Sequence, residues 1–487
     1  MQPSPPSSAP SSGAPSPGLR AGDRRLWTAL GALVLLASAA PLVRYYLVRQ
    51  PPEIWQVDLE VYRDGALSLL LGRDVYGWLT ASPQWLPFTY PPFAALLGMP
   101  LALVPFRAAG WLWTALQLWL LWFSTGVAFR PFLARFGARG PLVQGVVAGV
   151  LVWSLPVAEG IRFGQVNAVV VALCLADVAR RTPRLWPRGV LVGVAAAVKL
   201  TPGVFWIHWA VARRWRPLAA SVGATAAVTG LTFLLLPAAS ATFWTDALLD
   251  PGRLGPNAGT SNQSLRGALL RLWPGGSSVA GPGPGFSPVW LVVVLAVGAC
   301  GFAVSRRLEQ RGERVAVVAV VGMLAVLLSP VSWVHHVHWG IVVVGALLGD
   351  ARRPARVVAA AVALGTLLAR LPWWGANALA TGDLPRWLAR CMQSGYTLFA
   401  LVSVLLLWWL LVRRPDAGRN DAGQNGVGTP AAASSVTAAS TAQTPPPMRR
   451  TVLSRIRARS ARPSSAPMPE ISSSAAQAPT KTETGSL

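Results

Sequence analysis

Charged residues are scarce in this chain, and cysteine, histidine and lysine are scarcer still. Only 13% of the 487 residues are charged, whereas 53% are hydrophobic. Soluble domains carry about 25% charged residues, so this composition excludes a soluble globular protein. It predicts an all-α integral membrane protein, because a helix satisfies its own backbone polar groups in lipid. The 23 tryptophans are typical of anchoring at membrane interfaces.

The shortage of metal-ligating residues argues against a metal centre or a disulfide framework. The three cysteines, Cys174, Cys300 and Cys391, are far apart, and neither a CxxC pair nor an HExxH motif is present. We therefore expect no metal site.

Acidic residues are also few, with 18 Asp and Glu against 43 Lys and Arg, which gives a net charge of +25. All the basic residues except Lys199 and Lys481 are arginine. Arginine clusters hold loops in the cytosol. No basic run on a soluble segment is interleaved with stacking aromatics, so we expect no nucleic-acid partner.

Composition divides the chain into three parts. Residues 1–25 are rich in Pro, Ser, Gly and Ala and should be disordered and cytosolic. Residues 26–412 form the expected transmembrane domain. Residues 413–487 should be a second disordered cytosolic segment, and its arginines at 449–462 are either solvated or bound to anionic lipid headgroups.

About twelve apolar segments are long enough to be candidate membrane helices. They are 26–47, 92–106, 109–128, 141–157, 165–179, 188–212, 216–237, 288–305, 314–330, 337–349, 355–372 and 395–412. Twelve simple crossings place the arginine loops near 130–139 and 180–184 outside the cytosol, against the usual bias. The favoured alternative makes 92–106 a surface or re-entrant helix and splits 188–212 at Lys199, where Pro202 breaks the helical hydrogen bonding. Both termini are then cytosolic.

Asp58 is the strongest candidate for a catalytic residue. It follows the first apolar segment in the run VDLEVY, and Tyr62 lies one helical turn later on the same face. A carboxylate at the membrane surface can act as a general base. The alternative is a solvated or helix-capping aspartate, since Glu53, Glu60 and Asp64 lie nearby.

Two further polar positions stand out at the ends of apolar segments. Lys199 is the one lysine in the membrane domain, and it either pairs with a phosphate or extends to the interface. His335 and His336 follow a Ser-Pro break and either contact a substrate or form ordinary interfacial hydrogen bonds. Arg253, Asn262, Gln263 and Arg266 lie in a predicted external loop and suit sugar hydroxyls or phosphate.

The ordered motifs DLEVY, LPFTYPPFAAL, GQVN, GVAAAVKLTP, GRLGPNAGTSNQSLRGAL and LLSPVSWVHH resemble glycosyltransferase family 87 over about residues 26–412. These enzymes are the polyprenol-phosphate-mannose-dependent α-1,2-mannosyltransferases of mycobacteria and their relatives. The similarity is greatest to members that extend phosphatidylinositol mannosides.

The resemblance implies a GT-C-type helical bundle with a periplasm-facing site in the plasma membrane. It implies a polyprenyl-phosphate mannose donor, inversion at the anomeric carbon and no metal cofactor. It makes Asp58 the catalytic base and places an active-site histidine at His335 or His336. Lys199, Tyr62, Tyr90, Gln165, Asn167, Arg253, Asn262, Gln263 and Arg266 become candidate substrate-binding residues.

Several alternatives stay open from the sequence alone. The acceptor is either a phosphatidylinositol mannoside or a lipomannan-like chain. The donor sugar could instead be another polyprenyl-phosphate sugar such as arabinose. A rival of a different class is a flippase or transporter for lipid-linked sugars, although the paired halves with broken helices that transporters often show are not evident.

Overall fold

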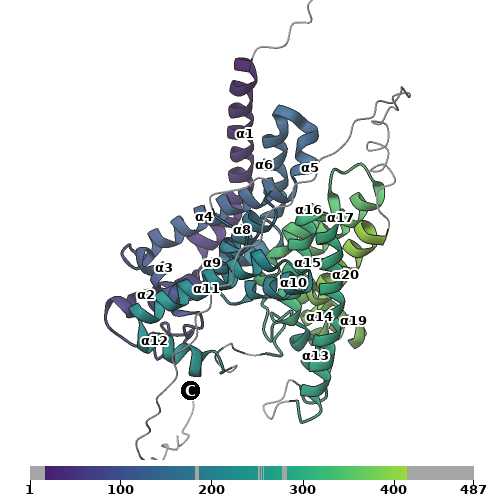
Figure 1. Ribbon diagram of the computed structural model, residues 1–487. Helices are drawn as coiled ribbons and strands as arrows, with labels where there is room; N and C mark the ends of the chain where they lie inside the picture. The colour runs from purple at the N-terminus through teal and green to yellow at the C-terminus, as the bar shows by residue number, and fades with distance from the viewer. Residues whose placement is uncertain are drawn as a thin grey trace, which may run out of the picture. The chain divides into compact units, whose positions relative to one another are not determined.

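The computed structural model describes residues 17–180, 186–250, 253, 255, 257–276 and 282–413 (Figure 1). These residues form helices and their connections, and the strand-like pairing among them is limited to the isolated bridges Leu79–Pro87 and Asn262–Trp333. The structure therefore fits the predicted all-helical membrane protein. Of the terminal segments expected to be disordered, 1–25 and 413–487, residues 1–16 and 414–487 lie outside the described residues.

The first half of the chain contains α1 to α10, with short 3-10 and π-helical turns between some of them. The bounds are α1 (Pro17–Arg44), η1 (Tyr45–Arg49), η2 (Pro52–Ile54), α2 (Val57–Leu70), α3 (Pro92–Ala102), α4 (Phe106–Ala128), α5 (Arg130–Leu133), η3 (Ala134–Arg139), α6 (Gly140–Leu151), α7 (Leu155–Phe163), α8 (Asn167–Val178), α9 (Val190–Val198), η4 (Thr201–Gly203) and α10 (Val204–Val211).

The second half continues the same pattern. Its elements are α11 (Trp215–Leu235), α12 (Pro237–Thr242), η5 (Phe243–Ala247), α13 (Leu265–Leu272), α14 (Phe286–Gln310), α15 (Arg314–Leu328), η7 (Val334–Trp339), α16 (Gly340–Leu348), α17 (Pro354–Leu368), α18 (Leu371–Thr381), α19 (Arg386–Gln393), α20 (Gly395–Trp408) and η8 (Trp409–Arg413).

All twelve predicted segments contain helix, but the structure does not support a count of twelve spans. Four described helices are long and apolar enough to cross a membrane, or up to seven if each sharply bent pair counts once. Helix α1 begins at Pro17, ahead of the expected start at residue 26, because proline is well suited to a first helical turn. The segment 141–157 is broken before α7, which has Pro156 in its first turn.

Two features agree with the favoured alternative arrangement of helices. The short helix α3 is bent by 114° from α4, so 92–106 does not continue into the next segment as a straight helix. The segment 188–212 breaks at Lys199, whose backbone is extended at φ −149° and ψ 123°. Helix α10 resumes after η4, which contains Pro202. The break leaves Lys199 at a helix end, as expected.

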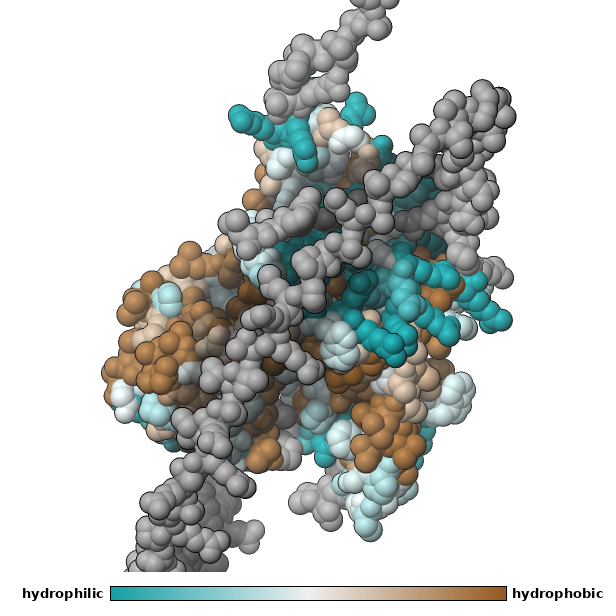
Figure 2. Space-filling model, viewed as in Figure 1, coloured by the Kyte–Doolittle hydropathy of each residue, from teal (hydrophilic) through white to brown (hydrophobic). Residues whose placement is uncertain are grey.

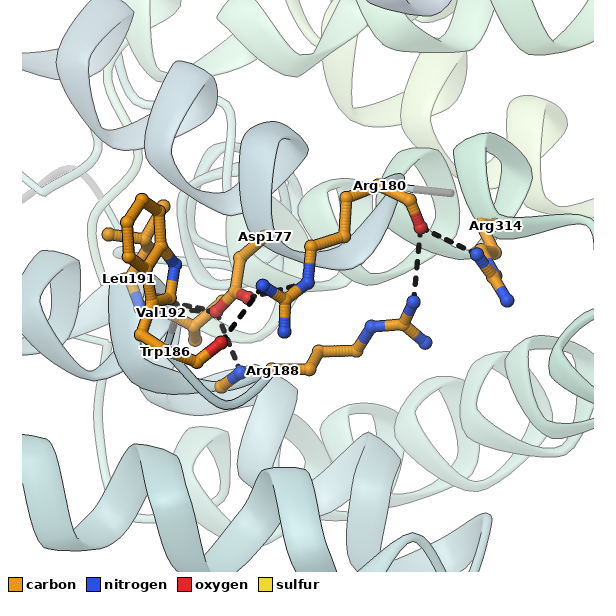
Figure 3. Close-up of polar contacts among 8 residues, drawn as sticks. Asp177, Arg180, Trp186, Arg188, Leu191, Val192 and Arg314 are labelled. Atoms are coloured by element: carbon orange, nitrogen blue, oxygen red, sulfur yellow. Dashed lines mark hydrogen bonds and ion pairs between the residues drawn. The ribbon is translucent and has the colours of Figure 1, made fainter. Parts of the chain in front are cut away.

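Helices α8 and α9 pack against each other, and a buried carboxylate fixes their far end (Figure 3). Asp177 Oδ2 accepts hydrogen bonds from the backbone N–H groups of Gly189, Leu191 and Val192 at 2.8, 3.1 and 3.2 Å. A carboxylate there satisfies the unpaired donors at the start of α9 and suits its helix dipole. Asp177 therefore sets the position of α9 relative to α8, at the end opposite Asn167 and Lys199.

The exposed surface has the character of a membrane protein. Helix α15 is buried along nearly its whole length, whereas α11 and α14 expose large side chains such as Leu234, Leu235, Val292 and Leu295. Figure 2 shows hydrophobic surface spread over the side where Figure 1 places α3, α4 and α11. Soluble monomers rarely expose contiguous apolar areas of this kind, so lipid is the natural neighbour of these helices.

Candidate active site

Asp58 is presented by the first turn of α2. Gln56 adopts a left-handed conformation (φ 46°, ψ 48°) immediately before the helix. Its side chain is fully buried, and its Nε2 donates to Thr114 Oγ1 at 2.9 Å and to the Ile161 carbonyl at 3.3 Å. This anchor fixes where α2 begins. Asp58 then lies in the first turn, where a negative charge is favoured by the helix dipole.

A glycine turn between α7 and α8 brings Gln165 to Asp58. Gly164 has φ 71°, and a Cβ built on it would lie 2.6 Å from the Leu59 Cβ. Both the left-handed backbone and the close approach to α2 therefore require glycine. Gln165 Nε2 donates to Asp58 Oδ2 at 2.6 Å. The other carboxylate oxygen of Asp58 has no hydrogen-bond partner within the described part of the chain.

Tyr62 and Tyr90 extend this network away from Asp58. Tyr62 is on the same face of α2, and its hydroxyl donates to Gln165 Oε1 at 3.1 Å and lies 3.0 Å from the Tyr90 hydroxyl. The two rings meet edge to face, with centroids 5.0 Å apart. Burial raises the pKa of both tyrosines. The phenols therefore stay protonated and hold Gln165 toward Asp58.

Asp58 lies outside the apolar segments and is only partly exposed. Burial raises the pKa of its carboxyl to about 6, although the hydrogen bond from Gln165 and the positive charge of Lys199 act in the opposite direction. A general base works best when its pKa is close to the working pH. Asp58 is therefore ionised near neutrality and more basic than an ordinary aspartate.

Lys199 forms the second half of the cluster. Its Nζ lies 3.0 Å from Asn167 Oδ1, 2.9 Å from His336 Nε2 and 5.4 Å from the centre of the Tyr90 ring. The side chain is buried, and its amine points to Asn167 and His336 rather than to the protein surface. The Tyr90 ring connects the lysine half of the cluster to the aspartate half.

The two adjacent histidines have different surroundings. His336 faces Lys199, and its Nδ1 accepts the Trp333 backbone N–H at 3.1 Å. His335 packs its ring against Phe163 and His336, and its carbonyl accepts from Asn167 Nδ2 at 3.1 Å. His335 Nε2 is buried without a partner among the described residues. His336 is therefore the histidine that belongs directly to the lysine network.

We call this cluster the polar centre, and it comprises Asp58, Tyr62, Tyr90, Gln165, Asn167, Lys199 and His336. It combines a carboxylate that has an unused oxygen, a buried lysine amine, and hydroxyl and amide groups. Such a set can accept a proton from a hydroxyl and neutralise a phosphate in the same reaction. The residues of the polar centre lie at or near the ends of several helices of this membrane protein.

Comparison with known proteins identifies the family of the chain. Glycosyltransferase family 87 matches residues 88–330. A polyprenol-phosphate-mannose-dependent alpha-(1-2)-phosphatidylinositol mannoside mannosyltransferase of Mycobacterium tuberculosis is 34% identical over 359 residues, which cover 70% of this chain and 81% of the relative. The chain belongs to glycosyltransferase family 87.

Two further relatives carry a related name. A polyprenol-phosphate-mannose-dependent alpha-(1-2)-phosphatidylinositol pentamannoside mannosyltransferase of M. tuberculosis is 34% identical, with 63% of this chain and 69% of the relative covered. Its namesake in Mycolicibacterium smegmatis is 32% identical, with 70% and 81% covered. No solved structure matches the chain significantly. As a member of family 87, the chain is a glycosyltransferase.

Four of the predicted binding residues of this family 87 enzyme lie outside the polar centre. Arg253 donates to the carbonyls of Tyr76 and Phe88 at 2.7 and 3.4 Å and so braces the loop that leads to Tyr90. Arg266 stacks over Trp290, 5.8 Å from its ring centre. These contacts give both arginines structural partners, and Arg253 Nε and Arg266 Nη1 are buried without a hydrogen-bond partner among the described residues.

Asn262 and Gln263 use their amides entirely within the chain. Gln263 donates to the Thr260 and Gln393 carbonyls and accepts from the backbone N–H groups of Tyr396 and Thr397. Asn262 donates to the Asn257 and Pro330 carbonyls and accepts from the Ser264 and Ser332 N–H groups. An amide has two donors and two acceptor positions, so neither has one left for a sugar.

Sequence reasoning missed Arg271, which completes this second cluster. It is buried, and its guanidinium donates to the Gly259 and Asn262 carbonyls at 2.9 and 2.7 Å and to Ser394 Oγ. We call Asn262, Gln263 and Arg271 the Gln263 cluster. It pairs with the Ser332–Trp333 backbone, which in turn holds His336, so it supports the polar centre from outside.

The structure gives no evidence of a metal centre in the parts it describes. Within residues 17–180, 186–250, 253, 255, 257–276 and 282–413, no three His, Cys, Asp or Glu side chains come close enough together to hold an ion. Metal independence remains an expectation.

Proposed function

We propose that this family 87 enzyme transfers mannose from polyprenyl-phosphate mannose to a 2-hydroxyl of a phosphatidylinositol mannoside, with inversion, to form an α-1,2 linkage. The names of the relatives support the donor, the linkage and the acceptor class. The observation that carries the proposal is the pairing, in one cluster, of a carboxylate of raised basicity with a buried lysine.

Each half of the polar centre has a role in this reaction. The acceptor 2-hydroxyl oxygen attacks the anomeric carbon, and its proton passes to the free oxygen of Asp58. The bond from the anomeric carbon to the phosphate oxygen breaks, and the phosphate leaves with the electron pair. Lys199, held by Asn167, neutralises the charge that develops on that phosphate, which is where electrostatic help lowers the barrier most. The reaction then needs no metal.

The remaining groups position the substrates. His336 and Tyr90 border Lys199 and are suited to orient the mannosyl phosphate. Gln165 holds Asp58 through one oxygen and leaves the other for the acceptor. Arg253 and Arg266 act indirectly, by bracing the external loops, rather than as phosphate ligands.

We infer the membrane topology from the distribution of arginine residues. We place the enzyme as a multi-pass protein of the plasma membrane, with its arginine-rich helix ends and both termini in the cytosol. The polar centre then faces the periplasm, where a lipid-linked donor presents its sugar. Labelling of single cysteines introduced at positions 137 and 350 tests this arrangement: both should be reachable from the cytosolic side only.

The decisive experiment is a transfer assay with purified full-length protein in lipid. The substrates are polyprenyl-phosphate mannose and a phosphatidylinositol tetramannoside, and the product is analysed for one added α-1,2-linked mannose. Polyprenyl-phosphate arabinose and GDP-mannose serve as matched donors that should give no product. A chelator should leave the rate unchanged.

Other outcomes would redirect the proposal. Transfer from the arabinosyl donor alone would overturn the donor assignment. Movement of polyprenyl-phosphate mannose across the bilayer without any transferred sugar would identify a transporter. Product from a lipomannan-like acceptor but not from the tetramannoside would change the acceptor.

A further inference from the structure

A basic cavity lies at the shared end of two apolar helices, away from the polar centre. It has a volume of about 400 Å³ and is lined by Arg307, Gln310, Arg311, Trp408, Val412 and Arg413. The first three residues end α14 or follow it directly, and the others end α20 and form η8. Both α14 and the α20–η8 segment are candidate membrane spans. The cavity is therefore where these two spans leave the apolar region.

Among the described residues that line the cavity, the charges are all positive. Three of its six lining residues are arginine, and none is acidic. The nearest acid along α14, Glu309, pairs instead with Arg214 at 3.0 Å. Guanidinium groups grouped without a carboxylate repel one another, and a bound phosphate relieves that repulsion through two-pronged hydrogen bonds.

The cavity is also partly ordered before any ligand binds. Arg311 Nη1 donates to the Leu411 carbonyl at 2.7 Å, which ties the turn after α14 to η8. The Arg413 guanidinium lies over the Trp408 ring at 5.7 Å. Tryptophan favours the headgroup level of a bilayer, and Trp408 and Val412 give the cavity an apolar wall beside its arginines.

We propose that this cavity binds the phosphate of an anionic phospholipid, with Arg307 and Arg413 as the principal contacts. Basic pockets between membrane helices recognise such headgroups, and the volume lies within the range of small-molecule sites. The apolar wall favours a lipid over a soluble phosphate, because a lipid also brings its glycerol and chains to Trp408. The site is independent of the proposed transfer reaction.

The test uses native mass spectrometry of the full-length protein in detergent, titrated with phosphatidylglycerol or phosphatidylcholine. The variant Arg307→Gln/Arg413→Gln removes two charges and keeps the Arg311 contact. The matched control, Arg216→Gln/Arg352→Gln, removes two exposed arginines elsewhere. We expect phosphatidylglycerol to bind the cavity variant about 30-fold more weakly, since each arginine near anionic lipid contributes roughly fivefold to binding.

Phosphatidylcholine binding should be equal in all three proteins, and the control should bind phosphatidylglycerol as the wild type does. An equal loss in the control would show general charge attraction and overturn the site. Unchanged binding in the cavity variant would also overturn it. Displacement of phosphatidylglycerol by millimolar inorganic phosphate would assign the cavity to a soluble anion instead of a lipid.

Discussion

The polar centre and the Gln263 cluster both contain side-chain amides and a buried basic residue, yet they use their polar groups in opposite ways. In the Gln263 cluster, both amides have all four hydrogen-bonding positions satisfied by the chain. In the polar centre, Asp58 keeps an oxygen without a partner among the described residues, and the Lys199 amine meets only side chains. A polar group with an unused hydrogen-bonding position is available to a substrate, whereas a group whose positions are all used within the chain stabilises the fold.

The largest effect should come from Asp58→Asn. The amide keeps an acceptor for Gln165 but cannot take a proton, so kcat should fall by about a thousandfold, within the range of general-base contributions. The stability of the folded protein should not fall with the activity. The pKa of the Asp58 carboxyl is raised by folding from 3.8 to about 6. The free energy of unfolding therefore falls as the pH rises between these two values, and the full loss is present above pH 6.

Rates and thermal midpoints at pH 7 check both halves of this prediction. The Tm of Asp58→Asn should equal or exceed that of the wild type. Asp64→Asn, on the same helix, is the matched control and should keep most of the activity. Substantial turnover in Asp58→Asn would remove Asp58 from the role of base, and a lowered Tm would assign it to the fold.

Lys199→Ala should have the next largest effect, about a hundredfold on kcat, because it removes the cation that balances the leaving phosphate. Lys199→Arg keeps the charge and should recover part of the loss. Arginine is larger than lysine and does not restore the packing of the lysine side chain. Recovered activity would therefore be due to the charge. If alanine and arginine were equally inactive while both folded, the contacts with Asn167 and His336 would matter more than the charge.

The pH profile gives a smaller effect with a defined sign. Asp58 must be ionised to act as a base, so kcat/KM should reach its plateau between the carboxyl pKa of about 6 and neutral pH. Below this pKa it should fall about tenfold for each unit. Initial rates from pH 4.5 to 8 in lipid measure the midpoint. A midpoint near the ordinary aspartate value would contradict the raised basicity of Asp58.

Some of the residues in this comparison could be identified from the sequence, and others could not. Lys199 stood out because charge is costly inside an apolar segment, and the helix break there followed from Pro202. Asp58 stood out by its place at the membrane surface with Tyr62 on the same helix face, and by the family resemblance. Asn262 and Gln263 looked equally suited to bind sugar. Gln263 bonds with Gln393 and Tyr396, which are about 130 residues away in the chain. A local sequence pattern does not predict such long-range hydrogen bonds.

The same limit applies to the histidines and to the membrane spans. His335 and His336 are neighbours in η7, and the ring that faces Lys199 is identified by three-dimensional contacts, the bond from the Trp333 N–H to His336 Nδ1 and the approach of His336 Nε2 to the lysine. The count of twelve spans rested on apolar length alone. Bends such as the 114° angle between α3 and α4 depend on packing between helices, which hydropathy does not report.

Gln263→Ala should have the smallest effect on the reaction and a clear effect on the fold. It leaves two carbonyls and two buried N–H groups without partners, and each such group costs about 1–3 kcal/mol, so we expect the free energy of unfolding to fall by a few kcal/mol. The value of kcat for the protein that remains folded should stay close to that of the wild type, because the Gln263 side chain bonds with residues outside the polar centre. Asn377→Ala removes an exposed amide and is the control for stability. A large fall in kcat with unchanged Tm would place Gln263 among the substrate ligands and erase the distinction between the two clusters.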